Sequence, residues 1–220
     1  MLNLGERPHK SNGQVVLNKD AVCLRGFAAA IAEELFLATI DIAKTTPFRQ
    51  MFTPGGKPMS AFMTNSGELG WISDRRGYRY AKTDPETGLA WPPMPQVFRD
   101  VATRAAAAGG FAPFEPDVAL INRYDIGARM SLHQDRDESD FTQPIVSVSL
   151  GLPAVFLWGG ALRSEKPKRI ELLHGDVVVW GGASRLNFHG IHPIAPNEHP
   201  LTGQFRYNLT FRRASPLRPA

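Results

Sequence analysis

The chain has 220 residues, a net charge of +4 and one cysteine. Its length suits a single domain with a sizeable core. The lone Cys23 excludes an internal disulfide framework and a thiolate zinc site, and it suits a reducing compartment. Residues 1–20 lack the apolar stretch of a secretory signal, and no apolar run is long enough to cross a membrane, so we expect a cytoplasmic protein without membrane contact. The modest positive charge is compatible with nucleic-acid binding but does not establish it.

The first half of the chain contains two segments with helical periodicity. From Ala28 to Thr46 the apolar residues recur at intervals of three and four, and Pro47 ends the run. A second helix is predicted from Pro95 to Ala108, with proline in its first turn and two glycines at its end. Residues 14–17 and 22–24 are predicted to form short strands before the first helix.

The segment between these helices, residues 48–91, has a different pattern. Short alternating pieces are broken by turn signals such as Pro54-Gly55-Gly56 and Asn65-Ser66-Gly67. Basic and aromatic side chains are interleaved here: Trp71, Arg75, Arg76, Tyr78, Arg79 and Tyr80. We interpret this segment as a hairpin-rich flap rather than part of a packed core.

From Asp117 onward the pattern changes to short strands separated by turn signals. The predicted strands are residues 118–124, 145–150, 154–158, 169–173, 176–180, 186–189 and 206–212. Short strands without intervening helices are typical of an antiparallel sandwich or jelly roll. The sequence therefore predicts a mainly β protein with flanking helices (α+β).

The central motif of this β-rich half is Leu132-His133-Gln134-Asp135. In an extended segment, His133 and Asp135 project from the same face, so an imidazole lies beside a carboxylate. A facial iron site uses two histidines and one carboxylate and leaves positions open for oxygen chemistry. The third ligand has to come from a downstream strand, and spacing leaves His174, His189 and His192 as candidates. The residue pattern alone does not choose between His189 and His192.

The segment Arg206–Arg212 alternates polar and apolar side chains, so Arg206, Asn208, Thr210 and Arg212 share one face. One interpretation is an edge strand with a solvated polar face. In the other, this face points into a barrel and its two guanidinium groups bind a dicarboxylate. Asn122 and Tyr124 share a face of their own strand and could add neutral donors. An iron site with such a clamp suits a 2-oxo dicarboxylate as cosubstrate.

Several motifs follow one another in a fixed order: Leu120–Tyr124, Leu132–Glu138, Ile145–Gly151, His174–Trp180 and Arg206–Arg212. Upstream the order includes Pro47–Met51, Thr53–Gly56, Leu69–Trp71 and Trp91–Pro92. Together they closely resemble the AlkB family of iron(II)- and 2-oxoglutarate-dependent DNA dealkylases, over residues 21–213. The chain departs from the family pattern in its tails and around residues 163–168.

The resemblance implies a fold and an order of parts within one domain. The fold is a double-stranded β-helix (jelly roll) with an N-terminal helix and a β-hairpin flap that recognises a nucleotide. The expected parts are a flexible tail (1–13), N-terminal strands and a helix (14–47), the nucleotide-recognition flap (48–91), the jelly-roll catalytic core (92–213) and a loose tail (214–220).

The resemblance also implies roles for individual residues. It selects His189 as the third ligand, so that iron(II) is held by the catalytic residues His133, Asp135 and His189. The residues implied for 2-oxoglutarate are Asn122, Tyr124, Arg206, Asn208 and Arg212, with Arg206 on the distal carboxylate and Arg212 near the metal-bound end. Those implied for the nucleotide are Trp71, Tyr78, Asp137 and Arg163.

The implied activity is oxidative demethylation of alkylated bases of the 1-methyladenine and 3-methylcytosine type. O2 and 2-oxoglutarate are the cosubstrates, and formaldehyde, succinate and CO2 are released. The partner is DNA, with RNA as a second candidate, and its base must be single-stranded or flipped out to reach the site. We expect a monomer. The alternatives are a jelly-roll hydroxylase that acts on a protein or small molecule, and a non-catalytic binding protein.

Overall fold

The computed structural model describes residues 13–216. In chain order its elements are β1 (Gln14–Asn18), β2 (Ala21–Leu24), the 3-10 turn η1 (Ala29–Ile31), α1 (Ala32–Thr45), β3 (Arg49–Phe52), β4 (Pro58–Gly67), β5 (Gly70–Asp74), β6 (Gly77–Ala81), α2 (Gln96–Ala108), β7 (Val118–Tyr124), β8 (Met130–His133), β9 (Ile145–Gly151), β10 (Ala154–Trp158), β11 (Lys168–Leu172), β12 (Val177–Trp180), the 3-10 turn η2 (Gly182–Ser184), β13 (His189–Ile191) and β14 (Arg206–Arg212).

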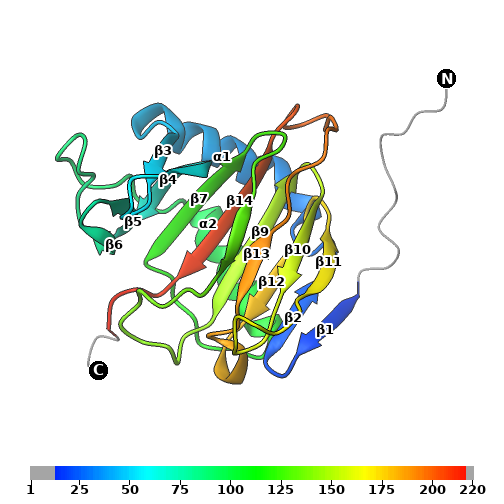
Figure 1. Cartoon of the computed structure of the whole chain (residues 1–220). Coiled ribbons are helices and arrows are strands. Elements are labelled where there is room, and N and C mark those ends of the chain that lie inside the picture. The colour runs from blue at the N-terminus through cyan, green and yellow to red at the C-terminus, as the bar shows by residue number, and fades with distance from the viewer. Residues whose placement is uncertain (1–12, 217–220) are drawn as a thin grey trace.

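Two antiparallel sheets form the centre of the described part of the chain. The larger has eight strands in the order β1-β2-β12-β9-β14-β7-β4-β3, and the smaller has four in the order β11-β10-β13-β8 (Figure 1). Buried residues of both sheets, such as Trp180 on β12 and Phe156 on β10, belong to one apolar cluster between them. This double-layered arrangement is the jelly roll that the sequence predicts.

The two helices cover the outer face of the larger sheet (Figure 1). Their buried residues, including Leu35 of α1 and Phe98 of α2, share a second apolar cluster with Val148 of β9 and Leu209 of β14. The strict alternation of β9 and β14 explains this packing, since every second side chain points toward the helices. The intervening polar side chains therefore point between the two sheets.

Both predicted helices are confirmed, but some strand boundaries differ. β13 begins at His189, where pairing with β8 and β10 starts, so residues 186–188 are not extended as predicted. The turn predicted at residues 65–67 is part of β4, which pairs with β7 as far as Gly67. A Cβ atom at Gly67 would lie only 2.2 Å from the Asp117 carbonyl oxygen and would collide with it. The φ of +125° also requires glycine.

Residues 48–91 belong to two different parts of the fold. β3 and β4 are strands of the larger sheet, and Met63 is buried in the core, whereas β5 and β6 form a separate hairpin (Figure 1). The tails expected at residues 1–13 and 214–220 lie outside the described residues, apart from Gly13 and residues 214–216. Within residues 13–216, neither helix is long and apolar enough to cross a membrane.

Candidate active site

A cavity of about 950 Å³ lies between the two sheets and reaches the β5–β6 hairpin. Every site residue that the resemblance implies lines it: Trp71, Tyr78, Asn122, Tyr124, His133, Asp135, Asp137, Arg163, His189, Arg206, Asn208 and Arg212. Segments far apart in the sequence thus converge on one site.

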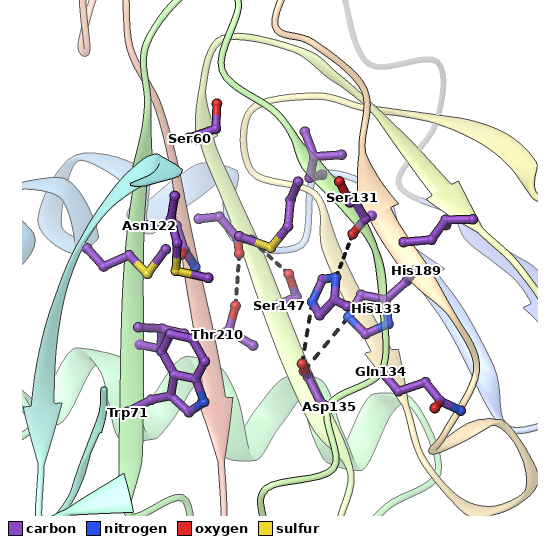
Figure 2. Close-up of a pocket in the computed structure, with 18 of the residues that line it drawn as sticks. Ser60, Trp71, Asn122, Ser131, His133, Gln134, Asp135, Ser147, His189 and Thr210 are labelled. Atoms are coloured by element: carbon purple, nitrogen blue, oxygen red, sulfur yellow. Dashed lines mark hydrogen bonds and ion pairs between the residues drawn. The ribbon is translucent and has the colours of Figure 1, made fainter. Parts of the chain in front are cut away.

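Two histidines and a carboxylate form a cluster in this cavity (Figure 2). One potential ligand atom from each of His133, Asp135 and His189 lies within 4.8 Å of the other two. Pairing of β8 with β13 places His133 opposite His189, whereas Asp135 lies beyond the end of β8 rather than on the strand. His192 is exposed and lies outside the cavity lining. Geometry therefore groups His189, not His192, with the His-Asp pair.

Backbone carbonyl groups orient both imidazole rings. The Nδ1 atom of His133 lies 2.9 Å from the Ser131 carbonyl oxygen, and that of His189 lies 3.0 Å from the Asn187 carbonyl oxygen. Each carbonyl favours a proton on Nδ1, which directs an unprotonated Nε2 toward Asp135. This donor set fits a divalent cation of the kind bound by a facial 2-His-1-carboxylate site.

The charge states of the cluster also fit a cation. Burial opposes ionisation of Asp135, but Arg212 and the two histidines hold the pKa of its carboxyl well below the usual range. Burial, with the neighbouring His133, lowers the pKa of His189 to about 4. Asp135 is therefore ionised and His189 neutral at physiological pH, as metal ligands must be.

A buried arginine, the first residue of β14, also lines the cavity. Arg206 is 0% exposed, and β14 lies between β7 and β9, so the interpretation of an edge strand with a solvated face is wrong. Its Nη2 donates to Ser149 Oγ at 2.9 Å, while its Nε has no hydrogen-bond partner among the described residues. Burial lowers its pKa to about 10. A buried cation with an unused donor fits a carboxylate ligand.

The two predicted asparagines differ in how much of their amide is available. Asn208 donates to Ser147 Oγ at 2.8 Å and to the Val148 carbonyl oxygen at 3.0 Å, and it accepts from Thr210 Oγ1 at 2.8 Å. Both of its amide N–H groups are thus engaged, and the amide orients the two hydroxyl groups. Asn122 Oδ1, in contrast, is buried without a partner in the described structure.

Arg212, the last residue of β14, contacts the His-Asp-His cluster. Its Nη2 donates to Asp135 Oδ2 at 2.7 Å, and its Nη1 is buried without a partner within residues 13–216. One part of the guanidinium therefore orients the carboxylate, and another is available to a ligand. The resemblance implies a place for Arg212 near the metal-bound end of 2-oxoglutarate, and the structure places its guanidinium group beside Asp135.

The aromatic residues of the hairpin face the cluster across the cavity. Figure 2 shows Trp71 on the opposite side from His133, Asp135 and His189. The ring of Trp71 stacks on Tyr78 with centroids 5.6 Å apart, and its Nε1 donates to Asp137 Oδ2 at 2.9 Å. An aromatic surface and a carboxylate are thus combined at the mouth.

The nearby arginines differ in their partners. Arg76 and Arg79 form ion pairs with Asp74 of the same hairpin. Arg163 also lines the cavity and lies over the ring of Phe188, 5.7 Å from its centroid.

Sequence reasoning missed several residues of the site. Ser147 and Thr210 line the cavity because they alternate along their strands with apolar residues that face the helices. Tyr80 and Glu138 line it as well, and a hydrogen bond of 2.7 Å joins them. Arg185 touches the Asp135 segment from η2, where no motif signals its role.

Comparison with known proteins identifies the family. Residues 20–212 match the family model described as the 2OG-Fe(II) oxygenase superfamily. The chain is 56% identical over 201 residues to the Escherichia coli (strain K12) alpha-ketoglutarate-dependent dioxygenase AlkB, which covers 91% of this chain and 93% of that protein. The chain belongs to the AlkB family. It is an iron(II)- and 2-oxoglutarate-dependent dioxygenase.

More distant similarity supports the same AlkB assignment. The Schizosaccharomyces pombe tRNA demethylase abh1 is 30% identical over 175 residues, which are 74% of this chain and 58% of that protein. The solved structure of OsALKBH1 superposes with a TM-score of 0.78 at 30% identity, covering 91% of this chain and all of the other. The AlkB fold is therefore shared beyond close relatives.

Proposed function

We propose that this AlkB-family dioxygenase demethylates alkylated bases of the 1-methyladenine and 3-methylcytosine type in DNA, with RNA as a second candidate. The observation that carries the proposal is the pair formed by Trp71 and Asp137, which share the cavity of the His-Asp-His cluster. An aromatic surface suits a base, and a carboxylate suits a base that methylation has made cationic.

In this proposal His133, Asp135 and His189 hold iron(II). Arg206 and Tyr124 bind the distal carboxylate of 2-oxoglutarate, Asn122 and Asn208 support it, and Arg212 lies near the metal-bound end. When bound, the iron supplies oxygen activation coupled to decarboxylation of 2-oxoglutarate to succinate and CO2. The protein contributes binding, orientation and exclusion of water.

The hairpin residues hold the methylated base next to the His-Asp-His cluster. The base enters only when single-stranded or flipped out, and stacking on Trp71 and Tyr78 replaces part of the stacking lost from the nucleic acid. Asp137 accepts a hydrogen bond from the exocyclic amino group, and Arg163, which lines the same cavity, contacts the nucleotide. The N-methyl carbon is then hydroxylated and leaves as formaldehyde.

The S. pombe relative, named a tRNA demethylase, supports a nucleic-acid substrate over a protein or small-molecule substrate. We propose a cytoplasmic monomer, since the free Cys23 suits a reducing compartment and one chain supplies all of the cavity residues described.

The experiment that separates these substrates measures succinate. The purified enzyme, iron(II), ascorbate and 2-oxoglutarate are incubated with an oligonucleotide that carries one 3-methylcytosine, with the unmodified oligonucleotide, or without either. We expect succinate in proportion to the methylated base and only slow background formation otherwise. Equal succinate in all three reactions would contradict the proposal and favour another substrate class.

A further inference from the structure

The segment that carries Asp135 and Asp137 has no regular secondary structure. Residues 134–144 connect β8 to β9 without a helix or strand. The hydrogen bonds of a sheet therefore do not fix these two carboxylates. A functional side chain on such a segment keeps its geometry only if other groups hold the segment in place.

Arg185 holds this segment at three points. Its side chain is 3% exposed, and it follows η2 directly. Its Nη1 donates to the Asp135 carbonyl oxygen at 2.7 Å, its Nε to the Gln143 carbonyl oxygen at 3.1 Å, and its Nη2 to Glu138 Oε2 at 2.9 Å. The planar guanidinium group has the fork of donors that such a three-point contact requires.

Glu138 extends the contact to the hairpin and to the cosubstrate end. Its side chain is 1% exposed, and its Oε1 accepts from the Tyr80 hydroxyl of β6 at 2.7 Å. The Nε of Arg212 lies 3.2 Å from the same Oε1, and Arg212 also binds Asp135 Oδ2 at 2.7 Å. A continuous chain of polar contacts thus runs from β6, through the buried Glu138, to the metal-ligand candidate Asp135.

We propose that Arg185 and Glu138 are positioning residues for Asp135, and that the Tyr80 hydroxyl couples nucleotide binding on the hairpin to occupancy of the metal and 2-oxoglutarate sites. The second part rests on the proposed function. Coupling of this kind is reciprocal, because each ligand has to stabilise the same arrangement of Glu138 and Arg212.

The network is suited to coupling because its parts are buried and depend on each other. Two guanidinium groups share the Glu138 carboxylate, which would be costly to bury alone. A displacement of β6 moves the Tyr80 hydroxyl, which is one of three groups on that carboxylate. Glu138 must then redistribute its bonds to Arg185 and Arg212, and Arg212 holds Asp135.

The first test measures metal binding without turnover. Cobalt(II) is titrated into the metal-free protein and followed through its visible absorption bands. Arg185→Lys keeps the charge but not the fork, and Glu138→Gln keeps the shape but not the charge. Loss of a group that orients a metal ligand typically weakens metal binding about 10- to 100-fold, so we expect at least about tenfold weaker binding and altered bands in both variants.

The matched control is Arg25→Lys, which removes a comparable guanidinium contact, to Asp176, outside the cavity. It should bind cobalt(II) like the wild type. Wild-type affinity and wild-type bands in both Arg185→Lys and Glu138→Gln would overturn the positioning role.

The second test measures coupling. The Kd of an oligonucleotide with one 3-methylcytosine is measured on the cobalt(II) protein with and without 2-oxoglutarate. We expect 2-oxoglutarate to tighten binding at least about fivefold in the wild type, at the lower end of common allosteric couplings. Tyr80→Phe should reduce this to less than about twofold, whereas Tyr207→Phe, on the helix-facing side of β14, should retain it.

The outcomes of the second test are distinguishable from failure of the proposed function. A wild type that does not prefer the methylated oligonucleotide contradicts the function, and the cobalt(II) titrations still decide the positioning role. A preference without coupling in the wild type, or undiminished coupling in Tyr80→Phe, overturns the coupling.

Discussion

Trp71 donates its indole N–H to Asp137 Oδ2 at 2.9 Å, so the hairpin ring and the carboxylate at the mouth of the cavity are directly joined. The bond fixes the plane of the ring and leaves the second carboxylate oxygen to accept from a base. Trp71 itself is anchored by Asn65, whose amide bonds both its backbone N–H and its carbonyl oxygen at 3.0 Å. The stacking surface is thus held from two sides.

Trp71→Ala should weaken binding of a methylated oligonucleotide while leaving metal binding intact. Loss of base stacking costs about 1–3 kcal/mol, which corresponds to roughly 5- to 150-fold in Kd. Fluorescence anisotropy with a labelled oligonucleotide measures the change, and a cobalt(II) titration is the control. An unchanged oligonucleotide Kd would contradict the stacking role.

The variants His189→Ala and His192→Ala should differ sharply in cobalt(II) binding and in turnover. Removal of His189 should weaken cobalt(II) binding by more than the roughly 10- to 100-fold typical of losing a group that only orients a ligand, and turnover should stop. His192 is exposed outside the cavity lining, so its removal should leave most activity. An inactive His192→Ala together with an active His189→Ala would show that His192, not His189, is the third ligand.

Arg206→Ala should raise the 2-oxoglutarate requirement with little effect on metal binding. Hydrogen bonds to charged groups contribute about 1.5–3 kcal/mol, so the KM for 2-oxoglutarate should rise roughly 10- to 150-fold. Arg206→Lys keeps the charge, so its KM for 2-oxoglutarate should lie between those of the wild type and Arg206→Ala. Steady-state succinate formation at varied 2-oxoglutarate gives the value, and an unchanged KM would refute the anchor.

Metal binding should compete with one proton, which binds to His133. Burial lowers the pKa of His133, but the hydrogen bond and charge of Asp135 outweigh burial and leave this pKa raised above its ordinary value. The pKa of His189 is already lowered to about 4. As pH falls through the pKa of His133, cobalt(II) affinity should therefore drop about tenfold per pH unit. Titrations from about pH 5 to about pH 8 measure the slope. A pH dependence that corresponds to two released protons, or to none, would contradict competition with a single proton on His133.

Much of the fold was predictable because periodicity reports burial directly. In β14 the alternation of polar and apolar residues predicted that Arg206 and Arg212 share a face, and β14 is central in the sheet. The His133–Asp135 spacing suggested a shared strand face, yet β8 ends at His133. The pair still converges because Arg212 and Arg185 hold Asp135 from outside the strand.

What the sequence could not predict depends on long-range contacts. The start of β13 at His189 is set by pairing with β8 and β10, which local propensity does not encode. The sequence around Asn65 resembles a turn, but the Asn65 side-chain amide bonds the backbone N–H and carbonyl oxygen of Trp71, as a neighbouring strand would. Arg185 stands in no recognisable motif, and only the folded chain brings it to Asp135.

The proposed activity is the removal of a methyl group from a nucleic-acid base. Intact-mass spectrometry of an oligonucleotide with one 1-methyladenine, incubated with the enzyme, iron(II), ascorbate and 2-oxoglutarate, tests it most directly, with His189→Ala as the inactive control. The account predicts loss of the mass of one methylene group in the wild-type reaction alone, together with formaldehyde. If the oligonucleotide mass stays unchanged although the enzyme has bound both iron(II) and 2-oxoglutarate, the proposed demethylation is contradicted.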